Sequence, residues 1–328
     1  MDRRRFLVTS LAGALATSRS TAAQQAGKMS RVGILNPGRQ FSPEAMARNP
    51  FLVPMRELGW VEGQNVLYEW RHANGQFELL PRLAAELVAS GVHVILSFAS
   101  AATRAAKDAT ATTPIVFGEV SQPVQQGLVA SVSRPGGNVT GIADVSIELM
   151  PKRLQLLKQL VPRAVRVAVL VNPDTQFGAM TLPDSQSAAR TLGLQLQTFD
   201  VRSSTDLDPT FARIRDSRSD AVTLIPEILF FVQRARIAEL ALKNRLPLIA
   251  EHRLQAEAGA VLVYNGSVRE VYRQAAKYVD QILKGAKPAD LPVQDPATFE
   301  LIINQKTAKA IGLSVPQPLL DRADRVID

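Results

Sequence analysis

The sequence predicts an α/β protein built from two similar lobes, each with a parallel sheet covered by helices. Two observations lead to this prediction. Short apolar runs alternate with segments of helical periodicity along almost the whole chain, which is typical of parallel sheets whose crossovers are helices. The first run of each series ends in Asn-Pro, at Asn36-Pro37 and again at Asn172-Pro173, so the pattern starts a second time in mid-chain.

The first series of elements runs to residue 142. Its strands are short, rich in branched apolar residues and bounded by Asn, Pro or Gly. Its helices carry apolar residues at helical spacing, and the helix over 78–90 ends at Gly91. The predicted strands span residues 31–35, 65–71, 92–97, 114–117 and 139–142; the predicted helices run up to Leu58 and over 78–90, 100–109 and 124–133.

The second series begins with a helix over 149–161 and a strand over 166–171. The same alternation of apolar runs and helical segments predicts the elements that follow. Further strands are expected at 194–201, 221–225, 246–250 and 260–264, with helices at 184–192, 209–216 and 230–244.

The last part of the chain contains one amphipathic helix over 268–283, a proline-containing link and one strand over 299–304. A lone helix and a lone strand need existing sheets to pack on. We therefore expect three crossovers between the lobes, near residues 143, 265 and 290. The N-terminal lobe would comprise residues 30–143 with 266–290, and the C-terminal lobe residues 144–265 with 291–328.

Residues 1–23 are predicted to be an export signal. Arg3, Arg4 and Arg5 precede a short apolar run over 6–16 and small residues over 20–23. The apolar run is too short for a transmembrane helix, which needs roughly 20 residues. The arginines also suit a twin-arginine signal, although Asp2 and Val8 depart from that pattern, so the general secretory and twin-arginine routes both stay open.

Composition narrows the classes of function. Apolar residues make up 46% of the chain and charged residues 21%, which is typical of a soluble globular protein, and there is no cysteine for a lipid anchor or a thiolate site. The formal net charge is +8, but Lys and Arg are mixed with acids along helices, as at Lys152-Arg153. We interpret this as a solvated basic surface and expect no nucleic-acid partner and a monomer.

Catalytic signals are weak. His72, His93 and His252 are the three histidines, and none has a second metal ligand at helical spacing. No phosphate-binding glycine loop, dinucleotide fingerprint or nucleophile elbow is present. We therefore expect no enzyme activity, no catalytic residues, no metal and no cofactor.

Ligands of parallel α/β sheets bind beyond the carboxyl ends of the strands. The candidate ligand-binding residues therefore follow the predicted strands: Asn36, Ser97, Phe98, Ser100, Ala101, Thr103, Glu119, Gln122, Asp144, Asn172, Glu227, Glu251 and Tyr264. The acids Glu119, Asp144, Glu227 and Glu251 suit a ligand ammonium group. The alternatives are that these acids are solvated loop charges and that Tyr264 is packing.

The segment from Ser97 to Thr103 joins a buried strand to a helix. Its first-turn backbone N–H groups, with the positive end of the helix dipole, suit a carboxylate or a phosphate. The alternative is that Ser100 only caps the helix. Phe98 either stacks on a ligand ring or belongs to the core.

Many ordered segments resemble the ABC-transporter substrate-binding proteins that include tryptophan- and tyrosine-binding members. They are residues 56–65 (RELGWVEGQN), 83–88 (LAAELV), 113–117 (TPIVF), 127–131 (GLVAS), 134–141 (RPGGNVTG), 152–154 (KRL), 282–288 (ILKGAKP), 299–304 (FELIIN) and 306–309 (KTAK). The resemblance implies the type I periplasmic-binding-protein fold, with two Rossmann-like lobes and three crossovers. Several family members have Gly-Thr in place of Ser97-Phe98, and often Asp in place of Gln122.

The resemblance implies a periplasmic solute receptor, and the absence of cysteine predicts that it has no lipid anchor. It would capture a small molecule, such as an amino acid or an aromatic or organic acid, in a cleft between the lobes. It would deliver this solute to an inner-membrane ABC permease with its cytoplasmic ATPase. The alternative is a periplasmic sensing subunit for a membrane signalling protein, and an exported hydrolase or isomerase is the third class.

Overall fold

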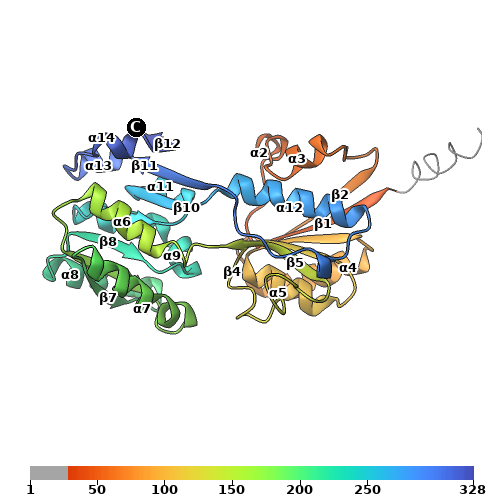
Figure 1. The fold of residues 1–328 in the computed structure, drawn as a ribbon, viewed down its shortest axis with the longest axis horizontal. Helices are drawn as coiled ribbons and strands as arrows, with labels where there is room; N and C mark the ends of the chain where they lie inside the picture. Colours follow the sequence, from red (N-terminus) through yellow and green to blue (C-terminus); the bar gives the residue numbers. More distant parts are fainter. Residues whose placement is uncertain (1–28) are drawn as a thin grey trace, which may run out of the picture. The chain divides into compact units, whose positions relative to one another are not determined.

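The computed structural model describes residues 29–328, which divide into two compact units (Figure 1). Unit 1 comprises residues 29–117, 128–141 and 275–292; unit 2 comprises residues 118–127, 142–274 and 293–328. The chain passes between the units after Gly141, Gln274 and Pro292, and residues 118–127 form a short additional excursion into unit 2. The lobe boundaries given above stay a prediction, and the predicted export signal lies outside the described residues.

Unit 1 is built around a five-stranded sheet in the order β2-β1-β3-β4-β5, of which β1 pairs in parallel with both β2 and β3. The strands are β1 (Ser30–Asn36), β2 (Val66–His72), β3 (Val94–Phe98), β4 (Ile115–Ser121) and β5 (Val139–Asp144). The helices are α2 (Pro43–Ala47), α3 (Leu52–Glu57), η1 (Phe77–Leu79), α4 (Leu80–Ala89), α5 (Ala99–Ala109) and η3 (Pro288–Asp290). In Figure 1, α3 lies on one side of this sheet and α4 and α5 on the other.

Unit 2 contains a seven-stranded sheet in the order β12-β11-β10-β9-β8-β6-β7. The strands are β6 (Arg166–Val171), β7 (Gln195–Asp200), β8 (Ala221–Leu224), β9 (Leu248–Ala250), β10 (Leu262–Gly266), β11 (Phe299–Asn304) and β12 (Arg325–Ile327). The helices are α6 (Met150–Leu160), α7 (Gln176–Thr191), η2 (Ser204–Asp206), α8 (Leu207–Asp216), α9 (Ile228–Val232), α10 (Arg234–Lys243), α11 (Arg253–Ala258), α13 (Gln305–Ala310) and α14 (Gln317–Leu320). Helix α12 (Val268–Leu283) carries the chain from unit 2 into unit 1.

The two sheets repeat one strand order. The order β7-β6-β8-β9-β10 in unit 2 matches β2-β1-β3-β4-β5 in unit 1, which is a doubly wound arrangement. The predicted α/β class with two similar lobes is therefore confirmed. One pair of strands departs from the parallel pattern: β11 is antiparallel to β10, with Leu262 opposite Ile303.

The core of unit 2 lies on both faces of its sheet. Along β6, Val167, Val169 and Val171 pack into one apolar cluster, while Ala168 and Leu170 pack into the other. Successive side chains of a strand point to opposite faces, so a continuous apolar run indicates a strand that is covered on both sides. This is why the run at 166–171 predicted a buried strand with the correct bounds.

Several predicted helices differ from the structure. The helix expected over 184–192 begins earlier, at Gln176, and the helix expected over 230–244 is divided at Gln233 into α9 and α10. Residues 124–133 form turns and bends, with Gly127 at φ +65°, so the helix predicted there is wrong. The helix expected up to Leu58 is divided into α2 and α3, because Pro50 follows Asn49 between them. Asn49 is buried, and its Oδ1 accepts from the backbone N–H of Phe51 at 2.9 Å. This hydrogen bond satisfies a backbone donor just before α3, so a second helix begins there. None of the helices within residues 29–328 has the length and apolar character needed to cross a membrane.

Candidate functional site

The carboxyl ends of β1 and β2 lie side by side in unit 1, with Asn36 opposite His72. Asn36 Oδ1 accepts from the backbone N–H of Gly38 at 2.9 Å, and Asn36 Nδ2 lies 3.1 Å from His72 Nδ1. The Asn36 amide therefore shapes the turn after β1 and positions the neighbouring imidazole.

An aromatic cluster stands at the same edge of unit 1. Trp70 stacks on His72 with ring centroids 5.6 Å apart, and Phe41 meets the Trp70 ring edge-on at 5.7 Å. All three side chains are half-buried, and burial lowers the pKa of His72. This cluster could not be predicted from the sequence, because Phe41 lies in a loop and Trp70 in a strand, and no spacing rule links them.

Ser97 and Thr103 are buried next to the end of β3. Their hydroxyl oxygens lie 2.9 Å apart, and Thr103 Oγ1 also donates to the carbonyl of Ala99 at 3.0 Å. Both hydroxyls are thus used inside unit 1, which favours a role in packing for these two candidates.

Helix α5 starts one residue earlier than predicted, at Ala99, and Phe98 occupies its N-cap position without a side-chain cap. The alternative in which Ser100 caps the helix is therefore wrong. Phe98 is 6% exposed and belongs to the core, whereas Ala101 is exposed. Ala99 has a φ of +63°, a conformation that costs a residue with a Cβ atom on the order of 1–2 kcal/mol.

Asp144, at the end of β5, is the centre of a hydrogen-bond network in unit 2. Its Oδ2 accepts from the hydroxyls of Ser121 at 2.8 Å and Ser146 at 2.5 Å. Its Oδ1 accepts from the Ser146 backbone N–H at 3.0 Å and from Asn265 Nδ2 at 3.4 Å. Four hydrogen bonds therefore hold the Asp144 carboxylate in place.

Arg153 lies next to this network and corrects the interpretation of the basic residues. The sequence analysis placed Lys152-Arg153 on a solvated surface, but Arg153 is 1% exposed. Its Nη2 donates to the Ser146 carbonyl at 2.5 Å and its Nη1 to the Tyr264 carbonyl at 3.3 Å, while Nε has no partner. Burial lowers the pKa of Arg153, and the charges of Glu251, Asp144 and Glu148 oppose that shift. Helical periodicity could have identified Arg153, because it falls on the apolar face with Leu154 and Leu157.

Glu251 follows β9 and is 7% exposed. Burial raises its pKa to about 7, and the neighbouring Arg153 charge only partly offsets this rise. Its backbone N–H donates to Gln255 Oε1 at 3.2 Å. The Glu251 Oε2 and Gln255 Nε2 atoms are buried without a hydrogen-bond partner, so the two side chains retain free binding capacity.

Glu119 and Gln122 flank the end of β4, and both have a positive φ, at +57° and +47°. Burial raises the pKa of Glu119 to about 7, and the Asp144 charge adds to the rise. Gln122 Oε1 is buried without a partner. Strained backbone at non-glycine residues is concentrated at functional sites in many proteins, which makes this turn a candidate binding element.

Asn172 and Glu227 stand at the ends of β6 and β8 in local roles. Asn172 Oδ1 accepts from the backbone N–H of Asp174 at 3.1 Å, as an Asn-Pro turn requires. Glu227 caps α9 by accepting from the Leu229 backbone N–H at 2.6 Å, and burial raises its pKa. Their side-chain oxygens are therefore already engaged.

Two aromatic contacts lie at the strand ends of unit 2. Tyr264 stacks on Phe299 with centroids 5.9 Å apart, which favours packing for this candidate. His252 meets Phe231 edge-on at 4.8 Å, and its Nδ1 accepts from the Leu254 backbone N–H. Burial lowers the pKa of His252 to about 4, so the imidazole is neutral at pH 7.

The structure thus brings part of the predicted set together. One polar network of unit 2 contains the predicted residues Glu119, Gln122, Asp144 and Glu251, together with Arg153 and Asn265, which were not among the predicted site residues. Asn172, Glu227 and Tyr264 are held by local contacts. Within residues 29–328, no group of three or more His, Asp or Glu side chains is arranged to hold a metal ion.

Comparison with known proteins agrees with this architecture. The family model for ABC transporter substrate binding proteins matches residues 45–327. A tyrosine-binding protein of Clostridioides difficile is 24% identical over 268 residues, which cover 81% of this chain and 76% of that protein. A Streptococcus pneumonia ABC domain in complex with L-Trp has a TM-score of 0.80 at 23% identity, over 92% of this chain and 100% of that one. A conserved domain protein of Vibrio cholerae has a TM-score of 0.79 at 25% identity, over 91% and 100% of the two chains.

Two doubly wound sheets, with polar side chains at their carboxyl edges, have the fold of the type I periplasmic binding proteins. The chain belongs to the ABC transporter substrate-binding protein family.

Proposed function

We propose that this protein is an exported, non-catalytic receptor that binds a small molecule, an amino acid or an aromatic or organic acid, and delivers it to an ABC permease. The proposal includes a periplasmic location, a monomeric state, and a permease that works with a cytoplasmic ATPase. Capture of the solute in a cleft between two lobes stays a prediction from the sequence and the family.

The main support for this proposal is the distribution of buried side-chain polar atoms that lack a hydrogen-bond partner. Among the described residues, five of the seven side chains with such an atom lie in unit 2: Gln122, Arg153, Glu251, Gln255 and Asn265. Contacts with Asp144, Glu148 or Glu251 connect them to one another. A buried polar group without a partner costs about 1–3 kcal/mol, so a protein retains several of them where a ligand or water completes the bonds.

The aromatic part of the proposal is supported by unit 1. The Phe41, Trp70 and His72 rings are half-buried at the carboxyl edge of the sheet, where they can contact an aromatic solute. Relatives named for tyrosine and L-Trp binding point to the same class of cargo.

Thermal unfolding of the purified protein against amino acids, aromatic acids and small sugars tests the proposal. A solute at 100 times its dissociation constant stabilises the folded state by about 2.7 kcal/mol. We expect a saturable shift with one chemical class and recovery of the compound unchanged. No shift with any of these compounds, in protein shown to be ligand-free, would contradict the proposed cargo class; conversion of the compound would contradict a non-catalytic role.

A further inference from the structure

Residues 118–127 belong to unit 2, although the chain on both sides of them belongs to unit 1. Two residues of this 118–127 segment, Glu119 and Gln122, have backbone φ angles of +57° and +47°. Residues with a side chain are strained in this region of backbone conformation, and they keep it only where surrounding contacts offset the strain. The segment therefore depends on its contacts with the rest of unit 2.

Two hydrogen bonds to acidic residues fix the 118–127 segment. Ser121 Oγ donates to Asp144 Oδ2 at 2.8 Å, and the Gln122 side chain forms a hydrogen bond with Glu148. Because Gln122 Oε1 has no partner, the amide nitrogen of Gln122 is the donor to Glu148. The contacts that hold the segment thus end on two carboxyl groups of unit 2.

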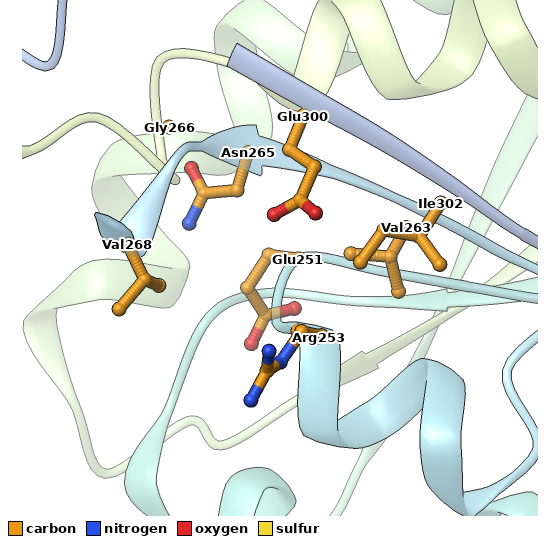
Figure 2. Close-up of a pocket in the computed structure, with 8 residues that line it drawn as sticks. All are labelled: Glu251, Arg253, Val263, Asn265, Gly266, Val268, Glu300 and Ile302. Carbon is orange, nitrogen blue, oxygen red and sulfur yellow. The ribbon is translucent and has the colours of Figure 1, made fainter. Parts of the chain in front are cut away.

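The Asp144 carboxylate cannot turn away from the 118–127 segment. Its second oxygen, Oδ1, accepts from the backbone N–H of Ser146 at 3.0 Å and from Asn265 Nδ2 at 3.4 Å. Figure 2 shows Asn265 at the end of β10, next to Gly266. Asp144 is therefore held from the strand side while Ser121 binds it from the segment.

Glu119 brings a further carboxyl group to the same place. The residue is half-buried, but its carboxyl group is enclosed by protein. The titratable groups that face it are Asp144 at the end of β5 and Tyr272 on α12. Burial is the larger influence and the Asp144 charge the smaller one, and together they raise the pKa of Glu119 to about 7. Neutral Glu119 is compatible with Asp144, whereas ionised Glu119 repels it.

We propose that Glu119 is a proton-operated switch for the 118–127 segment, which stays on unit 2 while Glu119 is protonated and is released when Glu119 ionises beside Asp144. The proton passes to solvent, and no covalent bond forms or breaks. Repulsion between the two carboxylates then acts against the hydrogen bonds from Ser121 and Gln122, and the strained backbone adds to the tendency to leave.

The switch would also regulate the binding site, because Glu119 and Gln122 are both candidate binding residues. This consequence rests on the proposed function. The switch itself does not, since every group that it needs belongs to the chain.

Linkage gives the sign and the size of the effect. The pKa of Glu119 is about 7 while the segment is in place, and its ordinary value of 4.5 returns when the segment is released into solvent. The segment in place therefore binds the proton more tightly, so release becomes more favourable as pH rises from 4.5 to about 7 and then stays constant. Between pH 6 and pH 8 the equilibrium constant for release should increase about tenfold.

Hydrogen exchange of the full, solute-free protein measures the release. Mass spectrometry follows peptides that cover residues 118–127 at pH 6 and pH 8, and each rate is divided by the intrinsic exchange rate at that pH. We expect the protection of the segment to decrease about tenfold from pH 6 to pH 8. Equal protection at the two pH values would overturn the inference.

Glu119→Gln keeps the shape of the side chain but cannot ionise, so the pH effect on the segment should be lost. Glu251→Gln is the matched control. Glu251 follows β9 (Figure 2) and also has a pKa raised to about 7, but it lies outside the 118–127 segment. The tenfold pH effect should be kept in this control. A pH effect that survives in Glu119→Gln, or one that is lost in Glu251→Gln, would assign the switch to another group.

Ser121→Ala gives a second test that does not depend on the folding of Glu119→Gln. This variant removes the hydrogen bond to Asp144 and leaves Glu119 in place. We expect faster exchange of the 118–127 segment at both pH values, with the tenfold pH effect kept. Unchanged exchange would show that the segment is not held through Asp144 and would overturn the inference.

Failure of this inference is distinct from failure of the proposed function. The exchange measurements use protein without solute, so an absent pH effect would remove the switch and leave the receptor in place. A panel of solutes without any binding would remove the receptor and leave the switch.

Discussion

Arg153 Nη1 donates to the carbonyl oxygen of Tyr264 at 3.3 Å, across 111 residues of sequence. The same guanidinium binds the Ser146 carbonyl through Nη2. One buried side chain on α6 thus connects the turn after β5 with the end of β10, within unit 2. Arg153 thus contacts both ends of the Asp144 network, because it donates to Ser146 itself and to Tyr264, the neighbour of Asn265.

Replacing Arg153 with methionine should strongly destabilise unit 2. The variant leaves two backbone carbonyls without their donor and removes the charge that opposes Glu251 and Asp144. Removing one partner of a buried charge network costs about 3–5 kcal/mol. Urea unfolding measures the change in the free energy of unfolding. Lys152→Met is the control at the neighbouring position, because the Lys152 side chain is only half-buried. Its free energy of unfolding should stay within about 0.5 kcal/mol of the wild-type value. A loss below about 1 kcal/mol for Arg153→Met would show that the network does not depend on the guanidinium.

The pH dependence of stability should report on Glu251. Its pKa increases from 4.5 to about 7 on folding, so the folded state binds more protons than the unfolded state between these values. Stability therefore decreases as pH rises through this window, by on the order of 3 kcal/mol from this one group. In Glu251→Gln this part of the decrease should be absent. Urea unfolding of ligand-free protein at pH 5 and pH 8 measures this decrease. If variant and wild type lost the same stability between the two pH values, the raised pKa of Glu251 would be refuted.

The hydroxyl pair next to β3 gives a test that separates packing from binding. Thr103→Val removes the bond to Ser97 and the bond to the Ala99 carbonyl, and should cost about 1–3 kcal/mol. Thr103→Ser keeps the hydroxyl and should lose less. Solute affinity should stay unchanged in both variants once each is folded. A weakened affinity without a loss of stability would instead place Thr103 in the binding site.

The backbone at the start of α5 should gain stability from glycine. Ala99 has a φ of +63°, which glycine adopts without the Cβ penalty, so Ala99→Gly should stabilise by about 1 kcal/mol. Ala101→Gly, two residues later and exposed, should destabilise by up to about 1 kcal/mol because glycine is a poor helix former. Denaturant midpoints of the two variants should therefore move in opposite directions; a shift in the same direction would argue against the positive φ at Ala99.

The sequence predicted those parts of the fold that depend on local periodicity. The run at 166–171 is apolar at every position after Arg166, and the strand has the predicted bounds because both of its faces are covered. The direction of β11 could not be predicted, since the buried run over 301–304 has the same sequence pattern in parallel and in antiparallel pairing. The helix expected at 124–133 is absent, because the positive φ of Gly127 is incompatible with a right-handed helix.

The candidate site was predictable in its place but not in its connections. Strand ends led to Asp144 and Glu251 because topology fixes where parallel strands stop. The Asp144 bond to Asn265 joins residues 121 positions apart, and no local pattern encodes it. Arg153 was assigned to the surface on its charge, although its helical position placed it among buried leucines. Charge and periodicity disagreed at this residue, and periodicity was the better guide to burial.

The addition of β11 and β12 to unit 2 has a consequence for the order of folding. Residues 293–328 close a sheet whose other strands begin at residue 166, and residues 275–292 belong to unit 1, which begins far upstream. Neither unit can be completed from a nascent chain that stops before these segments. Both units should therefore acquire their full resistance to proteolysis only after the ribosome has released residues 275–328. They should also fold slowly for their size, because segments that are distant in sequence must meet.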